Sequence, residues 1–506
     1  MSTLFSPSRP VPTRSELPHH IGIINDYVRI PYANGSSFAS QFLYREFLRR
    51  GHEVTVLGPR DPAARASELP RDSVEFASLP LRNHPGVHLA FPSLTGLKQA
   101  VASNLDVVVA QSGSGLLDLG VWLRAKAGVP FLCVNTIHLP SVYNVLLPDA
   151  LNSQPRVQRL FDDTLIPGVE RLTAEIYNKS DGLIVLSSGL EQYWRERGVR
   201  VPIHVIPRPV DPSVFDRPLT ADPFQPNFTR GQRLLCVCRH TREKDVDRLL
   251  RIFAQHILPN APEATLTLVG DGPDHDSYQA LARELGIRDR VDFPGEHPVT
   301  EMARYYRHAD LFVYASLSET YGQVVSEALW CGLPVIAFHD QMGVSHQLQN
   351  EDVGRLIAPG PDRASADREF GTEVVKLLAD PQARRAVSDR ATLLAHRRSD
   401  PELCVARHYA AFLEAREHCA RTWQPGTLPT RAVSLGRWTV FHGLLAGLGH
   451  LRKPATLNRH GRKQPSWEEL APETTAPSSA ARPQPVTFAG NAERSTAAAA
   501  ALSAAE

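Results

Sequence analysis

The chain has 506 residues, 42% of them hydrophobic and 22% charged, which is long enough for two to four domains and typical of a globular protein. Its 55 Lys and Arg residues nearly balance 54 Asp and Glu residues, and this balance excludes binding of nucleic acid through bulk charge. Residues 1–20 contain no apolar core of a signal peptide, and no run of about 18 apolar residues occurs, so we expect a cytoplasmic protein without a transmembrane segment.

Short β-rich apolar runs alternate with helical patterns, which is typical of parallel sheets built from βαβ units. The strands expected in the first half are Ile21–Ile24, Val54–Leu57, Val107–Ala110, Phe131–Val134, Gly182–Leu186 and Ile203–Ile206. Those expected in the second half are Leu234–Val237, Leu266–Val269, Val291–Phe293, Leu311–Tyr314 and Val335–Ala337. Between the halves, the prolines of Pro207–Pro212 cannot continue a helix or a central strand. We therefore expect an α/β protein with two Rossmann-like parallel-sheet domains that face a central cleft, the default ligand site.

The same signals divide the chain into seven segments. We expect a flexible N-terminus (1–20), an N-terminal domain (21–207), a linker (208–226), a C-terminal domain (227–400), a crossing helix (401–420), an extension (421–465) and a disordered tail rich in Pro, Ser, Thr and Ala (466–506). The extension has apolar residues at helical spacing around Trp438. They predict either an amphipathic helix at a membrane surface or, in the interpretation we prefer, a helix that packs on the protein's own core.

Asp26, Asn34 and Gly35 lie in the loop between the first strand and the following helix. A glycine in such a loop allows a ligand to approach the backbone closely, although an Asn-Gly pair on its own more often forms a plain turn. His138 follows the fourth expected strand, where a single histidine is usually structural.

Arg239 and Lys244 stand five positions apart in the loop after the strand Leu234–Val237. Such a loop could place two cations on a diphosphate, because Arg forks onto phosphate oxygens and Lys acts as a point charge. The alternative is a run of solvated charges.

Two carboxylates, Glu319 and Glu327, stand eight positions apart after the tenth expected strand. We expect a helix that begins near Tyr321 and stops before Gly332. Its first amides, at residues 321–323, favour an anion such as a diphosphate. Glu327, two turns into the helix, offers two acceptor oxygens to a vicinal diol such as a ribose. An ordinary exposed helix carboxylate is the alternative.

The segment Ser316–Ile336 resembles the E-x7-E segment of retaining GT-B glycosyltransferases of the family-4 type, a group that includes bacterial lipid and polysaccharide glycosyltransferases. The loops that carry Asn34-Gly35 and Arg239–Lys244 resemble two further segments of that family. The resemblance implies a GT-B architecture.

The resemblance also implies a role for each candidate residue. Glu319 would contact the sugar hydroxyls, His138 the donor sugar or its phosphates, and Arg239 and Lys244 the leaving diphosphate; these four form the implied catalytic set. Asp26 and Asn34 would line the acceptor side. The implied donor-binding residues are Gly35, Arg239, Lys244, Gly295, Glu319, Thr320, Tyr321, Gly322, Gln323 and Glu327.

The function that follows is front-face transfer, with retention, of a hexose from a nucleotide-diphosphate sugar to an acceptor hydroxyl. We expect a UDP-sugar rather than a GDP-sugar as co-substrate, no cofactor and no metal, although Asp245-Val-Asp247 and Asp274-His-Asp276 leave a metal site as a lesser alternative. We expect a lipid such as diacylglycerol as acceptor, and with it peripheral attachment to the inner face of the membrane. The alternatives are a soluble or polysaccharide acceptor, a GT-B epimerase or hydrolase that acts on the nucleotide sugar alone, and a catalytically silent GT-B scaffold.

Overall fold

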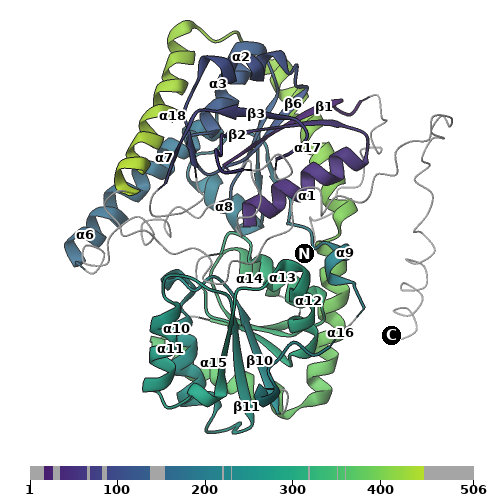
Figure 1. Cartoon of the computed structure of the whole chain (residues 1–506), viewed down its shortest axis with the longest axis vertical. Helices are drawn as coiled ribbons and strands as arrows, with labels where there is room; N and C mark the ends of the chain where they lie inside the picture. Colours follow the sequence, from purple (N-terminus) through teal and green to yellow (C-terminus); the bar gives the residue numbers. More distant parts are fainter. Residues whose placement is uncertain are drawn as a thin grey trace, which may run out of the picture.

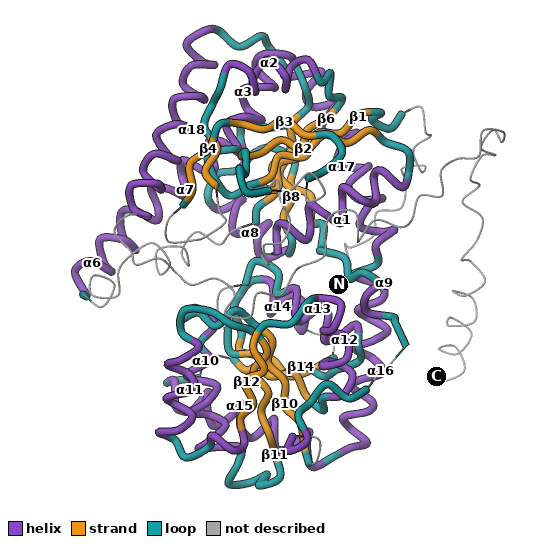
Figure 2. The backbone as a smooth tube through the Cα atoms, in the orientation of Figure 1, coloured by secondary structure: helices purple, strands orange, loops and turns teal. Residues whose placement is uncertain are grey.

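The computed structural model describes residues 16–26, 35–64, 69–81, 88–136, 154–218, 221–228, 231–316, 319–349, 352–358 and 360–449. The chain forms two halves, one above the other in Figure 1, and each half has a parallel sheet with helices on both faces. Figure 2 shows the strands of both sheets at the centres of the halves. The expected α/β fold with two parallel sheets is confirmed.

The N-terminal sheet has seven parallel strands in the order β3-β2-β1-β6-β7-β8-β9. Their bounds are β1 (His20–Asn25), β2 (Glu53–Pro59), β3 (Ser73–Phe76), β6 (Val107–Gln111), β7 (Phe131–Val134), β8 (Gly182–Val185) and β9 (Ile203–Val205). A small antiparallel pair, β4 (Ser78–Pro80) and β5 (His88–Ala90), lies outside it. The strand order reverses between β1 and β6, which opens a crevice at their carboxyl ends.

The C-terminal sheet has six parallel strands in the order β12-β11-β10-β13-β14-β15. Their bounds are β10 (Gln232–Val237), β11 (Ala264–Val269), β12 (Val291–Gly295), β13 (Leu311–Tyr314), β14 (Val335–Phe338) and β15 (Gly354–Ile357). Its order reverses between β10 and β13, so the loops after these two strands meet at one crevice. All eleven expected strands are present; β3, β4, β5 and β15 are additional.

The helices of the N-terminal half before the linker are α1 (Gly35–Arg49), α2 (Leu94–Ala102), α3 (Leu117–Ala127), α6 (Pro155–Leu160) with the π-helix η2 (Phe161–Leu165), α7 (Ile166–Tyr177) and α8 (Ser188–Glu196). Those of the second half are α9 (Pro212–Phe215), α10 (Val246–Ile252) with the π-helix η5 (Phe253–Ile257), α11 (His275–Glu284), α12 (Val299–His308), α13 (Gln323–Trp330), α14 (Gly343–Leu348), α15 (Arg363–Ala379) and α16 (Pro381–Arg398). Three short 3-10 turns are η3 (Pro226–Phe228), η4 (Arg242–Lys244) and η6 (Arg288–Arg290).

Two last helices, α17 (Pro401–Thr422) and α18 (Leu428–Gly449), return to the N-terminal half (Figure 1). On α17, Phe412 is fully buried, with its ring centroid 5.7 Å from that of Phe47 on α1. On α18, Trp438 is fully buried and its indole N–H donates to the Ala90 carbonyl at 2.8 Å. Segment 421–465 therefore contains a helix that packs on the protein's own core, as the preferred interpretation predicts. No helix in the described ranges is long and apolar enough to cross a membrane.

The N-terminal half has two hydrophobic cores, because the side chains of its strands alternate between the two faces of the sheet. Ile21 and Ile23 face α1 and α17, whereas Ile24 faces the core that includes Trp438, because successive side chains of a strand point to opposite faces.

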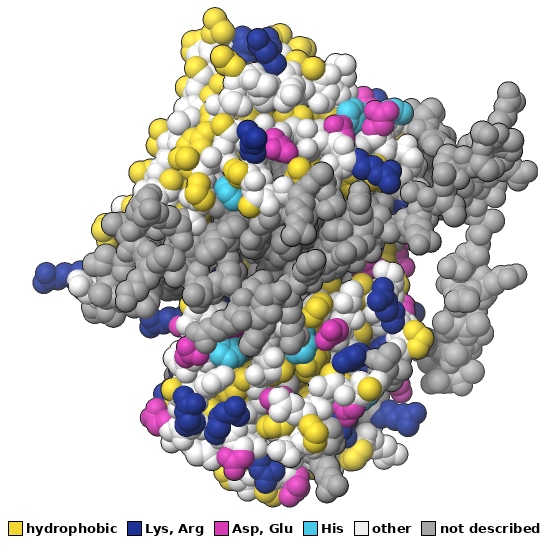
Figure 3. Space-filling model, viewed as in Figure 1, with side chains coloured by type: hydrophobic (Ala, Val, Ile, Leu, Met, Phe, Trp, Pro, Cys, Tyr) yellow, Lys and Arg dark blue, Asp and Glu magenta, His cyan; other side chains and the backbone are white. Residues whose placement is uncertain are grey.

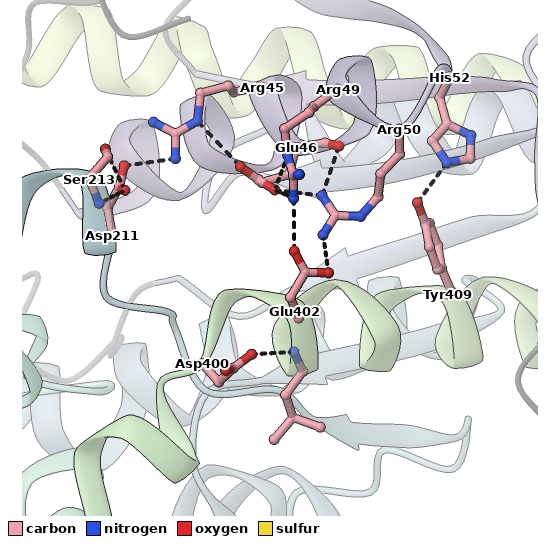
Figure 4. A network of polar contacts seen from close by, with 11 residues as sticks. Arg45, Glu46, Arg49, Arg50, His52, Asp211, Ser213, Asp400, Glu402 and Tyr409 are labelled. Atoms are coloured by element: carbon pink, nitrogen blue, oxygen red, sulfur yellow. Dashed lines mark hydrogen bonds and ion pairs between the residues drawn. The ribbon is translucent and has the colours of Figure 1, made fainter. Parts of the chain in front are cut away.

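The chain crosses between the halves twice, and the two crossings are hydrogen-bonded to each other: the Val210 amide donates to the Ser399 carbonyl at 3.0 Å. Figure 4 shows how α1 holds both crossings. Arg45 pairs with Asp211 at 2.7 Å, at the start of α9, and Arg50 pairs with Glu402 at 2.6 Å, at the start of α17. Ion pairs of α1 therefore hold both interdomain connections against the first half.

Candidate active site

The loop after β13 carries Glu319, and its carboxylate accepts three hydrogen bonds at Oε1. The donors are the Lys244 ammonium, the Tyr314 hydroxyl at 2.6 Å and the Ser316 hydroxyl at 3.0 Å. Burial raises the pKa of Glu319, but the Lys244 charge and the hydrogen bonds outweigh burial and hold this pKa below its ordinary value. Glu319 is thus an ionised, oriented hydrogen-bond acceptor.

The loop after β10 supplies the two cations that the sequence singles out. Lys244 lies in the short turn η4 and forms an ion pair with Glu319; burial lowers the pKa of Lys244, but this pairing raises it above its ordinary value. Arg239 is exposed, and no ion pair within the described residues involves it. The crevice between β10 and β13 therefore brings Glu319 and Lys244 together and leaves the Arg239 guanidinium available to an anion.

The helix after Glu319 begins later than expected. Gly322 has φ 77°, a left-handed conformation, and α13 starts at Gln323 rather than near Tyr321. A residue with positive φ cannot belong to a right-handed helix, and glycine adopts it at little cost. The Glu319–Gly322 segment is held from α14, since the Gly343 amide donates to the Glu319 carbonyl at 3.0 Å and the Gln347 amide group donates to the Gly322 carbonyl at 3.2 Å. The helix ends before Gly332, as predicted.

Glu327 lies inside α13 and is 8% exposed. The Tyr306 hydroxyl donates to its Oε2 at 2.9 Å, and burial raises the pKa of Glu327 to about 7. Its environment is therefore not that of an exposed helix carboxylate with a surface ion pair, the alternative that the sequence left open.

Gly295 ends β12 with φ 83°, and its carbonyl accepts from the Gly270 amide at 2.9 Å. Its backbone thus lies at the carboxyl edge of the C-terminal sheet. Thr320, between Glu319 and Tyr321, is partly exposed, and Tyr321 is buried against the core of the N-terminal half.

On the N-terminal side, Asp26 follows β1 at the point where the strand order reverses. Its carboxylate accepts from the Ser112 hydroxyl at 2.8 Å, the Gly113 amide at 3.2 Å and the Ser114 hydroxyl at 2.5 Å, all in the loop after β6. Asp26 therefore fixes this loop. Gly35 is the first residue of α1.

His138 and Asn34 lie outside the described residues, so their predicted roles remain predictions.

Three features escaped the sequence analysis. The Tyr314, Ser316 and Tyr306 hydroxyls serve the two glutamates, but nothing in their local sequence marks them. His240 is buried next to His275, with 2.9 Å between their Nδ1 atoms, and burial lowers the pKa of His240 to about 4.

Arg208 is the third feature, a partly buried arginine in the linker whose Nε atom has no hydrogen-bond partner among the described residues. In the sequence, its position between Pro207 and Pro209 could have pointed to this residue.

The Asp-x-Asp strings do not form a metal-binding group in the described part of the chain, where no three His, Cys, Asp or Glu side chains are arranged to hold a metal ion. Asp245 instead pairs with Arg363 at 3.0 Å.

Two family models match the chain: the glycosyl transferase 4-like domain over residues 34–209 and the glycosyl transferases group 1 over residues 220–393. The matches fall on the two halves seen in the fold, one on each. The chain belongs to the family-4 type of GT-B glycosyltransferases and is therefore a hexosyl-transferring enzyme.

Two relatives and one solved structure illustrate the similarity. The chain is 26% identical over 355 residues to the alpha-monoglucosyldiacylglycerol synthase of Streptococcus pneumoniae, covering 68% of this chain and 77% of that protein. It is 27% identical over 396 residues to the GDP-mannose-dependent alpha-mannosyltransferase of Mycobacterium tuberculosis, covering 76% and 94%. HepE of Anabaena, solved in complex with UDP, superposes with a TM-score of 0.57 at 18% identity, covering 76% of this chain and 97% of that chain, and shows the shared fold.

Proposed function

We propose that the enzyme transfers a hexose, with retention of anomeric configuration, from a UDP-sugar to a hydroxyl of a membrane lipid such as diacylglycerol, without a metal. The observation that carries this proposal is the pairing of Glu319 with Lys244 at the crevice between β10 and β13, with Arg239 in the same loop as Lys244. An ionised acceptor for sugar hydroxyls and cations for a diphosphate are the two requirements of such a reaction.

The electrostatic state of Glu319 favours a front-face reaction over a double displacement. Its Oε1 atom already accepts three hydrogen bonds, which orient the carboxylate and weaken it as a nucleophile. In the reaction that we propose, the acceptor oxygen bonds to the anomeric carbon on the face from which the diphosphate leaves. The bond from the anomeric carbon to the phosphate oxygen breaks, and the departing phosphate takes the acceptor's proton.

The diphosphate would lie against the opening of α13, where the amides and the helix dipole favour negative charge. Arg239 would donate to its oxygens in a forked geometry, and Lys244 would hold Glu319 while adding a second positive charge. Glu327 would accept hydrogen bonds from the ribose hydroxyls, and the backbone of Gly295 would contact the base. A UDP-sugar is preferred because HepE is a structural neighbour with UDP bound.

The lipid acceptor rests on two observations. One relative is named as a synthase of alpha-monoglucosyldiacylglycerol. In addition, large apolar side chains are exposed along the edge of the N-terminal half where α7 and α18 lie (Figure 3): Leu165, Val169, Leu172, Val433, Val440 and Leu444. Such a surface suits peripheral attachment to the inner face of a membrane, where a lipid acceptor is located.

The test is a transfer assay with UDP-glucose, UDP-galactose, UDP-N-acetylglucosamine and GDP-mannose, each with and without diacylglycerol vesicles. Glu319→Gln is the active-site variant, and Glu284→Gln, an exposed glutamate on α11, is the matched control. We expect a lipid product with the donor's anomeric configuration, lost in Glu319→Gln and kept in Glu284→Gln. Inverted product would refute retention, a product only with soluble acceptors would refute the lipid, and donor consumption without transfer would indicate an epimerase or hydrolase.

A further inference from the structure

Arg208 is a partly buried cation of the linker, and its Nε atom has no hydrogen-bond partner among the described residues. No hydrogen bond or ion pair within the described residues involves its guanidinium, and its Nε atom is buried and unpaired. Arg248, by contrast, is buried and donates to Asp367 at 2.6 Å. Because a buried charge without a counterion is costly, proteins usually pair such groups. An anion that is not among the described residues would therefore stabilise the charge of Arg208.

The linker places Arg208 between the two halves, next to the donor loop. The Gln323 side chain, at the start of α13, donates to the Pro209 carbonyl at 3.1 Å, while Arg45 on α1 holds Asp211 at 2.7 Å. Arg208 also lines a small pocket between α1, the carboxyl ends of β6, β7 and β8, and α17.

Burial lowers the pKa of Arg208 to about 10, and Tyr321 and Glu319 oppose this shift. At neutral pH the guanidinium remains protonated. The Lys244 charge is balanced by Glu319, whereas no ion pair within the described residues balances Arg239 or Arg208.

We infer that Arg208 is a third cationic ligand of the donor's diphosphate, delivered from the linker opposite Lys244. The inference rests on the proposed function, in which the lipid acceptor is neutral and the diphosphate is the anion that enters the cleft. The guanidinium donates hydrogen bonds to phosphate oxygens and stabilises the charge that develops as the bond to the anomeric carbon breaks. Because Arg208 belongs to the interdomain linker, the same contact ties donor binding to the relative position of the halves.

The experiment compares Arg208→Gln, Arg208→Lys and the control Arg217→Gln, an exposed arginine of the same linker. Calorimetric titration of the full chain measures affinity for UDP and for uridine, which lacks phosphates, and melting temperatures report on folding. We expect Arg208→Gln to weaken UDP binding about tenfold or more, because a charge-assisted hydrogen bond is lost, and to leave uridine binding within about twofold. Arg208→Lys should recover part of the UDP affinity, and Arg217→Gln should resemble the wild type.

Two results would refute the role of Arg208 and leave the proposed function standing. Wild-type UDP affinity in Arg208→Gln, with a raised KM for the acceptor, would assign this cation to the acceptor. Equal losses for UDP and uridine, with a lower melting temperature, would make Arg208 a structural support. A wild-type chain that binds neither UDP nor GDP would instead remove the proposed function together with the inference; if it binds GDP only, the titrations use GDP and guanosine.

Discussion

Glu327→Gln tests both the burial and the proposed role of the second glutamate. Burial raises the pKa of Glu327 from its ordinary 4.5 to about 7. Between these values the native carboxyl keeps its proton while the unfolded one loses it, so the native state binds more protons and stability falls as pH rises. At 1.36 kcal/mol for each pKa unit, the loss between about pH 4 and pH 8 is about 3 kcal/mol. The glutamine side chain cannot ionise, so Glu327→Gln should not show this loss.

The assay is urea denaturation of the wild type, Glu327→Gln and the control Glu284→Gln at several pH values from 5 to 8. We expect the stability difference between Glu327→Gln and the control to grow toward high pH by about 3 kcal/mol at most. Parallel profiles for all three proteins would refute the reasoning.

The same variant tests ribose binding. Only the ionised carboxylate can accept hydrogen bonds at both oxygens without carrying a proton, so wild-type UDP affinity should rise as pH passes through about 7. Glu327→Gln should bind UDP about tenfold more weakly at pH 8, with a flat pH profile, since a hydrogen bond to a charged group contributes about 1.5–3 kcal/mol. Unchanged UDP affinity at pH 8 would remove Glu327 from the donor site.

Glu319→Gln should lower kcat at least about a hundredfold with UDP affinity nearly unchanged, because the contacts that we propose for Glu319 are with the sugar; a loss of UDP affinity in calorimetry would contradict this assignment. Trp438→Ala should destabilise the protein by about 3–5 kcal/mol and expose α18 to limited proteolysis, since Trp438 is fully buried; an unchanged urea midpoint would argue against that packing. Gly343→Ala should weaken UDP binding, because an added Cβ would overlap the Tyr321 backbone and displace the donor loop; wild-type affinity would show that the loop tolerates the shift.

The sequence predicted the central strands because they are buried on both faces and therefore read as continuous apolar runs, as in Val107–Ala110. It missed β3 and β15, which are edge strands with polar residues such as Glu75 and Arg355. The residues of the crevice after β10 and β13 were predicted from their motifs, but their pairing was not. That Lys244 binds Glu319, 75 positions away, follows from the strand order, which no local pattern contains. Arg208 was overlooked because its prolines pointed to backbone geometry alone.

The return of α17 and α18 has a consequence for synthesis on the ribosome. The core of the first half includes Phe412 and Trp438, so it stays incomplete until α18 has emerged, whereas the second half is continuous in sequence. At about 5–20 residues per second, the roughly 240 residues between the linker and the end of α18 take on the order of 10–50 s to translate. During that interval the nascent N-terminal sheet exposes apolar faces, and the domain that is made second completes its folding first.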